Sequence, residues 1–351
     1  MPFARLLGTL AVLTVLGACQ KPSEEGDPPL DAGMTGDAGT PGGDAGTTGD
    51  AGTPPLAFSA ANWNLEFFGS PDAGPSNEQL QLDNVRKVIS TTGADIWGLE
   101  EVVDATHFAA LKQQLPGYDG FLANEVPYGS TYYSTTEQKV GLLYRSDVVT
   151  LLDKQLILTS SNYDFGTRPP LRVDLRITRD GASVDLVAIV LHMKAFSDME
   201  SYDRRRRAAL ALEDYLDTEL MNTPVLVLGD WNDDVDVSIT RDPNVVNGYM
   251  PTPYKNLLDA PEEYTFLTQP LSLVGQRSTV SNTQFIDHQL VSNELLPRYV
   301  SDSAQRLRPD NYISQYGTTT SDHYPVLSRF VFDVTPPPDS SRRLTSPAGS
   351  E

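Results

Sequence analysis

The chain has 351 residues, of which 39% are hydrophobic and 21% charged, and its formal net charge is −21 at pH 7. This length allows one large α/β domain or two smaller ones. The negative charge argues against a passive nucleic-acid binder, which needs a basic surface, but not against a metal-dependent enzyme, where a bound cation reverses the local charge. The single cysteine, Cys19, excludes a disulfide framework and a thiolate metal site.

The first residues have the pattern of an export signal. Arg5 precedes a mostly apolar stretch, Leu6 to Leu16, which is too short to span a bilayer but suits a signal peptide over residues 1–18. The stretch ends in Leu16-Gly17-Ala18-Cys19, which resembles the lipobox of bacterial lipoproteins. That resemblance implies lipidation of Cys19 and an exported protein anchored in a bacterial membrane, with the outer membrane expected. The alternative is an ordinary signal peptide with an incidental cysteine.

Two low-complexity segments flank the central part of the chain. Residues 19–55 contain four Asp-Ala-Gly repeats among Gly, Thr and Pro, a composition that cannot bury enough apolar surface to fold. The repeats lack the period of calcium-binding β-helices, so we interpret this segment as a disordered tether. Residues 335–351 are expected to be a disordered tail. The predicted folded domain is therefore 56–334.

Within this domain, apolar segments of strand length alternate with polar loops and two helical patterns. The predicted strands are Phe58–Asn64, Asp95–Val102, Val140–Tyr144, Leu171–Ile177, Val184–Val190, Val225–Leu228, Phe285–Val291 and Val326–Phe332. The predicted helices are Asn77–Thr91, with Leu80, Val85, Val88 and Ile89 at helical spacing, and Arg204–Leu216. Strands interleaved with helices, and an apparent hairpin at Arg179-Asp180-Gly181, predict an α/β fold with two packed mixed β-sheets.

Polar side chains stand where these strands end. They are Asn64, Glu100 and Glu101, His192, Asp230 and Asn232, Asp287 inside a strand, and Asp322 and His323 just before the last strand. Strand ends gather functional groups because the strands fix the backbone while the loops stay free to be polar. If the ends converge, they form an oxygen-rich site, which suits a hard cation such as Mg²⁺, Mn²⁺ or Ca²⁺.

These segments resemble the endonuclease/exonuclease/phosphatase superfamily, whose best-known fold is that of deoxyribonuclease I. The motifs stand in family order as Trp63-Asn64, Leu99-Glu100-Glu101-Val102, Arg168-Pro169-Pro170, His192-Met193-Lys194, Gly229-Asp230-Trp231-Asn232, Asp287 and Ser321-Asp322-His323-Tyr324-Pro325. The resemblance covers roughly residues 58–333. It implies a deoxyribonuclease I-like four-layer α/β sandwich, with helices flanking the two sheets.

The resemblance also implies a Mg²⁺-dependent hydrolase, with Mn²⁺ or Ca²⁺ as alternatives, in which water attacks a phosphodiester in line with the leaving group. The expected metal ligands are Asn64, Glu101 and Asp322. Arg168 is expected to hold a phosphate oxygen. Asp230 and Asn232 sit two apart, so an extended segment would point both side chains to one side. They would position the water or support a second metal.

The predicted proton-transfer groups are histidines. His323 is the expected general base, because its pKa lies near neutrality, and Asp287 is expected to fix its tautomer. His192 is expected to donate to a phosphate oxygen or to the leaving group. Alternation along the strand puts Asp287 and His288 on opposite faces, which excludes His288 from the site. His107 is interpreted as a core histidine.

Three features leave alternatives open. The family's Gln-Glu pair is Glu100-Glu101 here, and the flanking residues align Glu101 with the metal ligand. The tyrosine or glutamate that usually precedes the Val140 strand has three candidates, namely Tyr132, Tyr133 and Glu137. The run from Arg204 to Arg207 is interpreted as a solvated helix face rather than a DNA-binding patch.

Together these features predict an exported, lipid-anchored monomer that cleaves DNA or RNA as a nuclease. A phosphatase or phosphodiesterase acting on inositol phosphates or sphingolipids is the alternative among enzymes. Against it, the inositol phosphatase branch is expected to show W-x-G-D-x-N-[YF]-R, whereas this chain has Val-Leu-Gly-Asp-Trp-Asn-Asp-Asp at that place. A catalytically inactive surface-binding lipoprotein is the alternative from another class.

Overall fold

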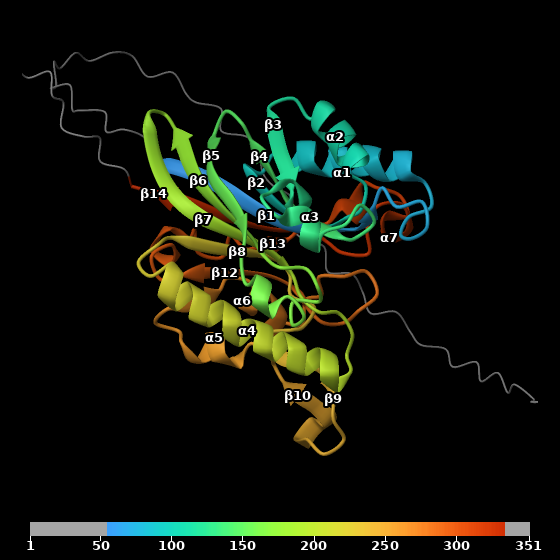
Figure 1. Cartoon of the computed structure of the whole chain (residues 1–351), viewed down its shortest axis with the longest axis vertical. Coiled ribbons are helices and arrows are strands. Elements are labelled where there is room, and N and C mark those ends of the chain that lie inside the picture. Colours follow the sequence, from blue (N-terminus) through green and yellow to red (C-terminus); the bar gives the residue numbers. More distant parts are fainter. Residues whose placement is uncertain (1–54, 334–351) are drawn as a thin grey trace, which may run out of the picture. The chain divides into compact units, whose positions relative to one another are not determined.

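The structure is a computed structural model, and it describes residues 55–333. The predicted signal peptide, Cys19, nearly all of the predicted tether, and the predicted tail lie outside the described residues. Within them, two β-sheets lie face to face between two layers of helices (Figure 1). No helix of this described part is long and apolar enough to cross a membrane.

The first sheet has six strands in the order β13-β14-β1-β2-β4-β3. The strands are β1 (Leu56–Phe68), β2 (Ile96–Val102), β3 (Tyr118–Leu122), β4 (Lys139–Arg145), β13 (Gln305–Arg306) and β14 (Val326–Phe332). β1 runs parallel to β2 and antiparallel to β14, so the sheet is mixed. The register between β1 and β2 shifts after Asn64, which marks an irregularity where both strands end.

The second sheet also has six strands, in the order β11-β12-β8-β7-β6-β5. They are β5 (Val149–Leu156), β6 (Leu171–Arg179), β7 (Ala182–His192), β8 (Val225–Asp230), β11 (Tyr264–Phe266) and β12 (Asp287–Ser292). β7 and β8 are parallel, and β6 and β7 form the predicted hairpin. Asp180 and Gly181 both have positive φ in its turn, as a tight two-residue hairpin requires. β9 (Val237–Arg241) and β10 (Tyr249–Pro251) form a separate two-stranded sheet.

Helices cover the outer face of each sheet (Figure 1). α1 (Glu78–Thr92) and α2 (Ala105–Gln113) share a buried apolar cluster with the first sheet, whereas α4 (Met199–Glu219) and α5 (Lys255–Asp259) share one with the second. A third cluster fills the space between the sheets. The predicted fold class, two mixed sheets flanked by helices, is confirmed.

Several elements differ from the sequence-based expectation. The shorter helices α3 (Gly129–Tyr132), α6 (Gln269–Leu273) and α7 (Tyr316–Thr319) were not predicted, nor were α2, α5, β3, β5, β9, β10, β11 and β13. In α1, Leu80 is exposed, and Gln81 takes the buried position instead. The Gln81 amide donates to the carbonyls of Leu65, Glu66 and Thr320, so it holds three irregular backbone segments together.

The space between the sheets changes from apolar to polar along the strands. On β1, Phe58 and Ala60 belong to the apolar cluster, whereas Asn62 and Asn64 follow on the same face. On β8, Leu226 and Leu228 precede Asp230 in the same way. Because these strands run parallel to their neighbours β2 and β7, the polar ends meet at one edge of the sandwich.

Candidate active site

The polar strand ends predicted from the sequence converge at this edge. Across the second sheet, Asp230 is paired with His192 on one side and with Asp287 on the other. Asn64 on the first sheet donates to the Asp230 Oδ2 atom at 3.0 Å. Two sheets therefore contribute to one buried cluster, to which the loop before β14 adds His323.

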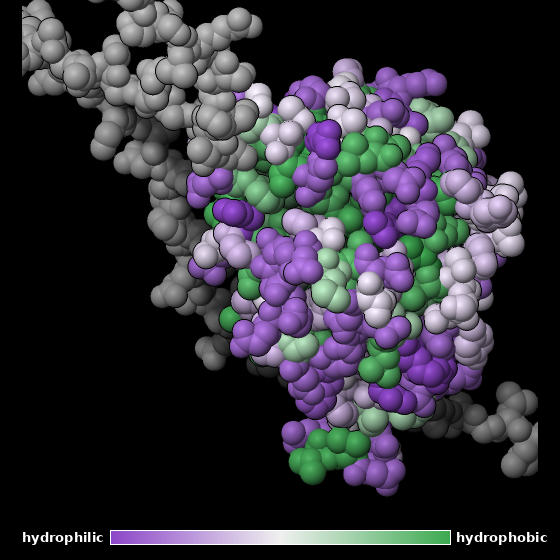
Figure 2. Space-filling model, turned by 60° about the vertical axis from the view of Figure 1, so that its left-hand side comes forward, coloured by the Kyte–Doolittle hydropathy of each residue, from purple (hydrophilic) through white to green (hydrophobic). Residues whose placement is uncertain are grey.

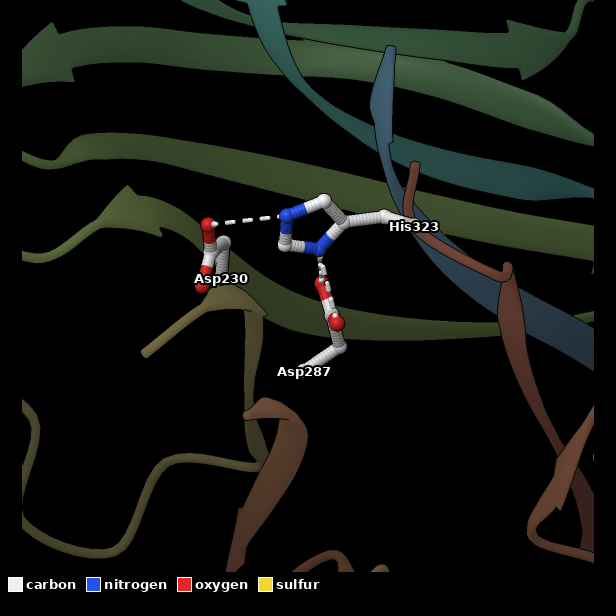
Figure 3. Close-up of side chains that lie close together, drawn as sticks. All are labelled: Asp230, Asp287 and His323. Atoms are coloured by element: carbon white, nitrogen blue, oxygen red, sulfur yellow. Dashed lines mark hydrogen bonds and ion pairs between the residues drawn. The ribbon is translucent and has the colours of Figure 1, made fainter. Parts of the chain in front are cut away.

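His323 and Asp287 form a hydrogen-bonded pair (Figure 3). His323 Nδ1 lies 3.0 and 2.9 Å from the two carboxylate oxygens of Asp287. The backbone of His323 is held as well, because its N–H donates to Ser321 Oγ and its carbonyl accepts from the Trp63 indole. The imidazole is therefore fixed with Nε2 directed towards Asp230, 3.9 Å away.

The charge of His323 depends on the acids around it. Burial lowers the pKa of His323, but the carboxylates of Asp287, Asp230 and Asp322 outweigh burial and raise it well above the ordinary value. The Asp322 Oδ1 atom lies 3.8 Å from Nε2, on a side chain that is partly exposed. The His323 ring thus lies between two buried acids, Asp230 and Asp287, and the partly exposed Asp322.

Asp230 is buried and surrounded by hydrogen-bond donors. Burial, opposed by the charge of His323 and aided by that of Asp287, raises the pKa of Asp230 to about 7. Its Oδ1 atom accepts from the backbone N–H of Asn232 at 2.8 Å. Asn232 has a φ of 54°, so the segment turns here and the prediction of an extended segment is wrong. The Asn232 side chain instead donates to the Met193 carbonyl at 3.1 Å.

Three carboxylates lie close together where β1 and β2 become irregular, namely those of Glu66, Glu101 and Asp322. Glu66 and Glu101 both have positive φ, and such bulges commonly redirect side chains beside active sites. Burial, together with the charges of Asp322 and Glu101, raises the pKa of Glu66 to about 7. Sequence reasoning missed Glu66, because the predicted strand ended two residues earlier, at Asn64.

The donor set fits a hard cation. Asp230, Asp287 and His323 each offer a ligand atom, and these atoms lie within 4.8 Å of one another. Since Asp287 and His323 already bond to each other, the remaining acids are Asp230, Glu66, Glu101 and the less buried Asp322. Buried carboxylates in excess of nearby cations are costly unless a bound ion compensates them. Oxygen donors of this kind suit Mg²⁺, Mn²⁺ or Ca²⁺.

His192 is a neutral buried histidine. Burial, aided by the positive charge of Arg168, lowers the pKa of His192 well below its ordinary value. Its Nε2 atom lies 3.5 Å from Asp230 and 3.8 Å from Glu101. Its Nδ1 atom is buried without a hydrogen-bond partner among residues 55–333. A neutral ring keeps one N–H donor, and Nε2 is the atom on the side of the carboxylates.

Arg168 lies in the loop before β6 and braces the His192 strand end. Its guanidinium donates to the carbonyls of His192 and Met193 and to Gln138 Oε1. Arginine has five N–H donors, and these contacts within residues 55–333 use three of them. Of the three candidates left open before the Val140 strand, Tyr133 is the one beside this loop, since its hydroxyl donates to the Pro169 carbonyl at 2.8 Å.

Glu100 points into the layer between the sheets. Neither of its carboxylate oxygens has a hydrogen-bond partner in the described part of the chain. Burial raises the pKa of Glu100 well above its ordinary value, and Asp287 and Asp230 add to the rise. An uncharged carboxyl group resembles a glutamine amide in shape, and glutamine is the residue expected here from the family pattern.

The arginine run is not the uniform solvated face that the sequence suggested. Arg205 is fully buried and pairs with Asp233, and Arg204 donates to the Tyr163 carbonyl. Only Arg206 and Arg207 are exposed. The helix must pack one side against the second sheet, so arginines in consecutive positions receive different environments.

The remaining two histidines lie away from the cluster. His288 is buried on the opposite face of β12 from Asp287, where its Nδ1 lies 2.8 Å from Thr268 Oγ1. His107 is not the core residue that was expected, because it is partly exposed and lies 3.5 Å from Asp104.

Comparisons with known proteins agree with this geometry. The profile of the Endonuclease/Exonuclease/phosphatase family matches residues 61–323. The fold is similar to that of an AP endonuclease from Archaeoglobus fulgidus, with a TM-score of 0.54, 16% identity, and coverage of 79% of this chain and 100% of that chain. A search of curated proteins gave no match.

Two further solved structures share the fold. D. rerio TDP2 complexed with a single-strand DNA product has a TM-score of 0.54 and 16% identity, over 78% of this chain and 98% of that one. A mannosyl-6-phosphatase from Bacteroides thetaiotaomicron has a TM-score of 0.50 and 16% identity, over 77% and 98%. At these identities the likeness shows the fold.

Proposed function

This chain belongs to the endonuclease/exonuclease/phosphatase family, and from that premise we propose that it is a metal-dependent nuclease that hydrolyses phosphodiesters of DNA or RNA. The observation that carries the proposal is the buried His323–Asp287 pair set beside Asp230 and the excess of carboxylates. A nucleic-acid substrate is supported by the AP endonuclease and the single-strand DNA complex among the similar folds.

The proposed metal ligands are Glu101 and Asp322, with Asn64 supporting the shell. Asn64 links the two halves of the site, since its amide N–H donates to Asp230 and its oxygen accepts from the Glu66 backbone. A bound Mg²⁺ would supply Lewis acidity towards a phosphate oxygen. The same charge would offset the carboxylates that raise the pKa of His323, and the ring could then serve as a base.

We assign the removal of the water's proton to His323. Nδ1 is occupied by Asp287, which leaves Nε2 as the atom that can take a proton. Asp230, whose oxygens accept from Asn64 and Asn232, is placed to orient the attacking water. Asn232 adds no such contact through its side chain, which is turned to Met193, so its proposed role is to hold Asp230.

His192 and Arg168 are proposed to act on the phosphate oxygens. The neutral Nε2–H of His192 can donate a hydrogen bond, and Arg168, which has five N–H donors, holds the backbone of this strand end. Donors aimed at developing negative charge stabilise the transition state. In a site with this many acids, these two groups are needed for an anionic substrate to bind.

A phosphomonoesterase is the second candidate function. It is favoured by the mannosyl-6-phosphatase among the similar folds, because the same donors and base would serve a terminal phosphate. Inositol phosphates carry terminal phosphates of this kind, whereas removal of a sphingolipid headgroup would be hydrolysis of a phosphodiester.

The test is incubation of the purified full-length chain with plasmid DNA, RNA, phosphoinositides and mannose 6-phosphate, each with Mg²⁺ and then with EDTA. We expect cleavage of DNA or RNA with Mg²⁺ or Mn²⁺, and none in EDTA. Undiminished cleavage in EDTA would overturn the metal mechanism. Phosphate release from the monoester alone would favour the second candidate.

The location of the protein is a separate proposal. We infer from the lipobox-like segment ending at Cys19 that the chain is exported and anchored by lipid at this residue, with the enzyme domain outside the cytoplasm. Two or more acyl chains hold a protein stably at a membrane, whereas a single chain does so only marginally. Cys19→Ser should therefore move the protein from the membrane fraction to the soluble fraction. An unchanged distribution would contradict the anchor.

A further inference from the structure

A groove of about 760 Å³ opens beside the active site. Asn232 lines its inner end, so the groove is continuous with the segment that holds Asp230. The loop after β7 supplies one wall, the β9–β10 hairpin supplies another, and the loop before β12 completes it. Figure 2 shows the hairpin as the lowest projection of the molecule, where a small hydrophobic group lies within a mostly hydrophilic surface.

Two walls of the groove carry an aromatic ring beside a cation. Phe196 has 70% of its surface exposed, and the Lys194 ammonium lies 4.2 Å from its ring centroid. Across the groove, the Arg241 guanidinium lies 4.6 Å from the Tyr249 ring centroid. Asn282 and Gln284 supply side-chain amides between these walls. The lining thus combines flat rings, positive charges and hydrogen-bonding groups.

The backbone that carries the exposed ring of Phe196 is held in place by a buried side chain. Phe196 has a φ of 80°, which is a strained conformation for a bulky residue. Arg205, which is fully buried, donates to the Phe196 carbonyl at 2.7 Å and to the Lys194 carbonyl at 2.8 Å. Arg205 also donates to Asp233 and Thr240. These two residues are the chain neighbours of Asn232 and Arg241, which line the groove. Strain that the surroundings enforce is commonly found at ligand sites.

We propose that this groove binds an unpaired nucleotide of a single-stranded nucleic acid, next to the phosphodiester that is cleaved, with its base stacked on Phe196. This inference rests on the proposed nuclease function and specifies its substrate. A nucleotide presents a planar base with hydrogen-bonding edges and an attached phosphate, which match the ring, the amides and the cations. A base can stack on a side chain only when it is free of its duplex partner.

The same lining disfavours a lipid tail. An acyl chain needs a continuous apolar wall, whereas Ser197, Asp198, Asn282 and Thr283 interrupt this one. Asp198 is itself engaged, since it caps α4 by accepting from the Ser201 backbone and hydroxyl. These hydrogen bonds partly compensate the negative charge of Asp198, so its repulsion of a nearby phosphate is reduced.

The test compares the full-length protein with Phe196→Ala and Tyr249→Ala on a single-stranded oligonucleotide, in DNA and in RNA form. Two further substrates are tested. One is the same strand annealed to its complement, and the other is the same strand with an abasic site on either side of the cleaved bond. Tyr312→Ala is the matched control, because Lys87 lies 5.3 Å from its ring on a different surface. Binding of each variant to anionic phospholipid vesicles is measured in parallel.

We expect the wild type to prefer the single strand, and each groove variant to raise KM for it by about tenfold or more with little change in kcat. When the abasic site removes the base that stacks on Phe196, Phe196→Ala should cause no further rise in KM, because the stacking is already lost. Tyr312→Ala should behave as wild type. No cleavage of any strand by the wild type would contradict the proposed function itself.

Cleavage by the wild type with no effect of either groove variant would overturn the groove proposal and leave the nuclease function standing. An equal loss on the intact and abasic strands would also overturn it, because Phe196 would then act through the structure of the site. Weaker vesicle binding by Phe196→Ala, with unchanged cleavage of the single strand, would assign the groove to a lipid surface instead.

Discussion

The two ends of the layer between the sheets have opposite chemistry, one apolar and the other polar. At one end, Phe58 and Phe330 stack with ring centroids 4.9 Å apart, inside a fully apolar cluster. At the other end, β1 presents Asn64, and β8 and β12 of the second sheet present Asp230 and Asp287, which are as buried as the phenylalanines. Burial of apolar rings stabilises a fold, whereas burial of acids destabilises it unless partners compensate.

This difference indicates that the two ends of the layer between the sheets have separate roles. Apolar packing at one end fixes the register, and the fixed register aligns the acids at the other end. In the middle, the amide of Gln289 donates to Asn62 Oδ1, and its oxygen accepts from Ser328, so the change from apolar to polar is made through satisfied groups. We therefore expect changes at the polar end to alter rate, and changes at the apolar end to alter stability.

The largest expected effect is at the polar end. His323→Ala should lower kcat by about 10²–10⁴-fold, because it removes the general base. Asp287→Asn should also be costly, since an amide favours the wrong tautomer of the ring. The double variant should be little worse than His323→Ala alone, because groups that act as a unit are not additive. Steady-state kinetics on the preferred strand would measure these values.

His288→Ala is the control for this pair, since it lies on the other face of the same strand. It should keep near wild-type kcat. If it lost as much activity as His323→Ala while its circular dichroism spectrum stayed native, the assignment of the base would be wrong.

The next effect belongs to the apolar end. Phe330→Ala should reduce the free energy of unfolding by about 3–5 kcal/mol, because it leaves a cavity beside Phe58. Urea titration followed by circular dichroism would measure it. At 25 °C the folded variant should keep the wild-type kcat. A large loss of kcat in the folded variant would show that the two ends are not separable.

The sequence predicted the two packed sheets and most of their central strands, but neither the shorter elements nor all of the site. Long apolar runs such as Val225–Leu228 gave strands, and the polar residues after them converged as expected. The edge strand β5 was missed because its residues are mostly exposed and show no apolar run. Glu66 and the turn at Asn232 depend on bulges and positive φ angles, which arise from contacts between distant segments. Local sequence patterns do not specify such contacts.

Two neighbouring acids at the polar end, Glu100 and Glu101, are expected to differ in their roles. Glu101→Gln should lower activity by about 10–100-fold or more and raise the Mg²⁺ concentration needed for half-maximal rate. Glu100→Gln should stay near wild type, because burial raises the pKa of this carboxyl well above its ordinary value and so favours the uncharged form, which an amide matches in shape. Mg²⁺ titrations of both variants would check this. The reverse result would exchange the roles of the two residues.

The smallest effect concerns a polar group that lies outside the site. Burial lowers the pKa of His288 to about 4, although the charge of Asp287 opposes this. A histidine in the unfolded chain has a pKa of about 6.5. Between these values the unfolded state binds a proton that the folded state does not, so the free energy of unfolding rises with pH through this window.

For His288 alone, the rise between pH 5 and pH 7 should be about 2 kcal/mol. His288→Gln should remove that part of the pH dependence, while the carboxylates, common to both proteins, cancel in the difference between the two urea titrations. If His288→Gln kept the wild-type pH dependence but lost kcat, this histidine would belong to the catalytic end. The separation between the two faces of β12 would then fail.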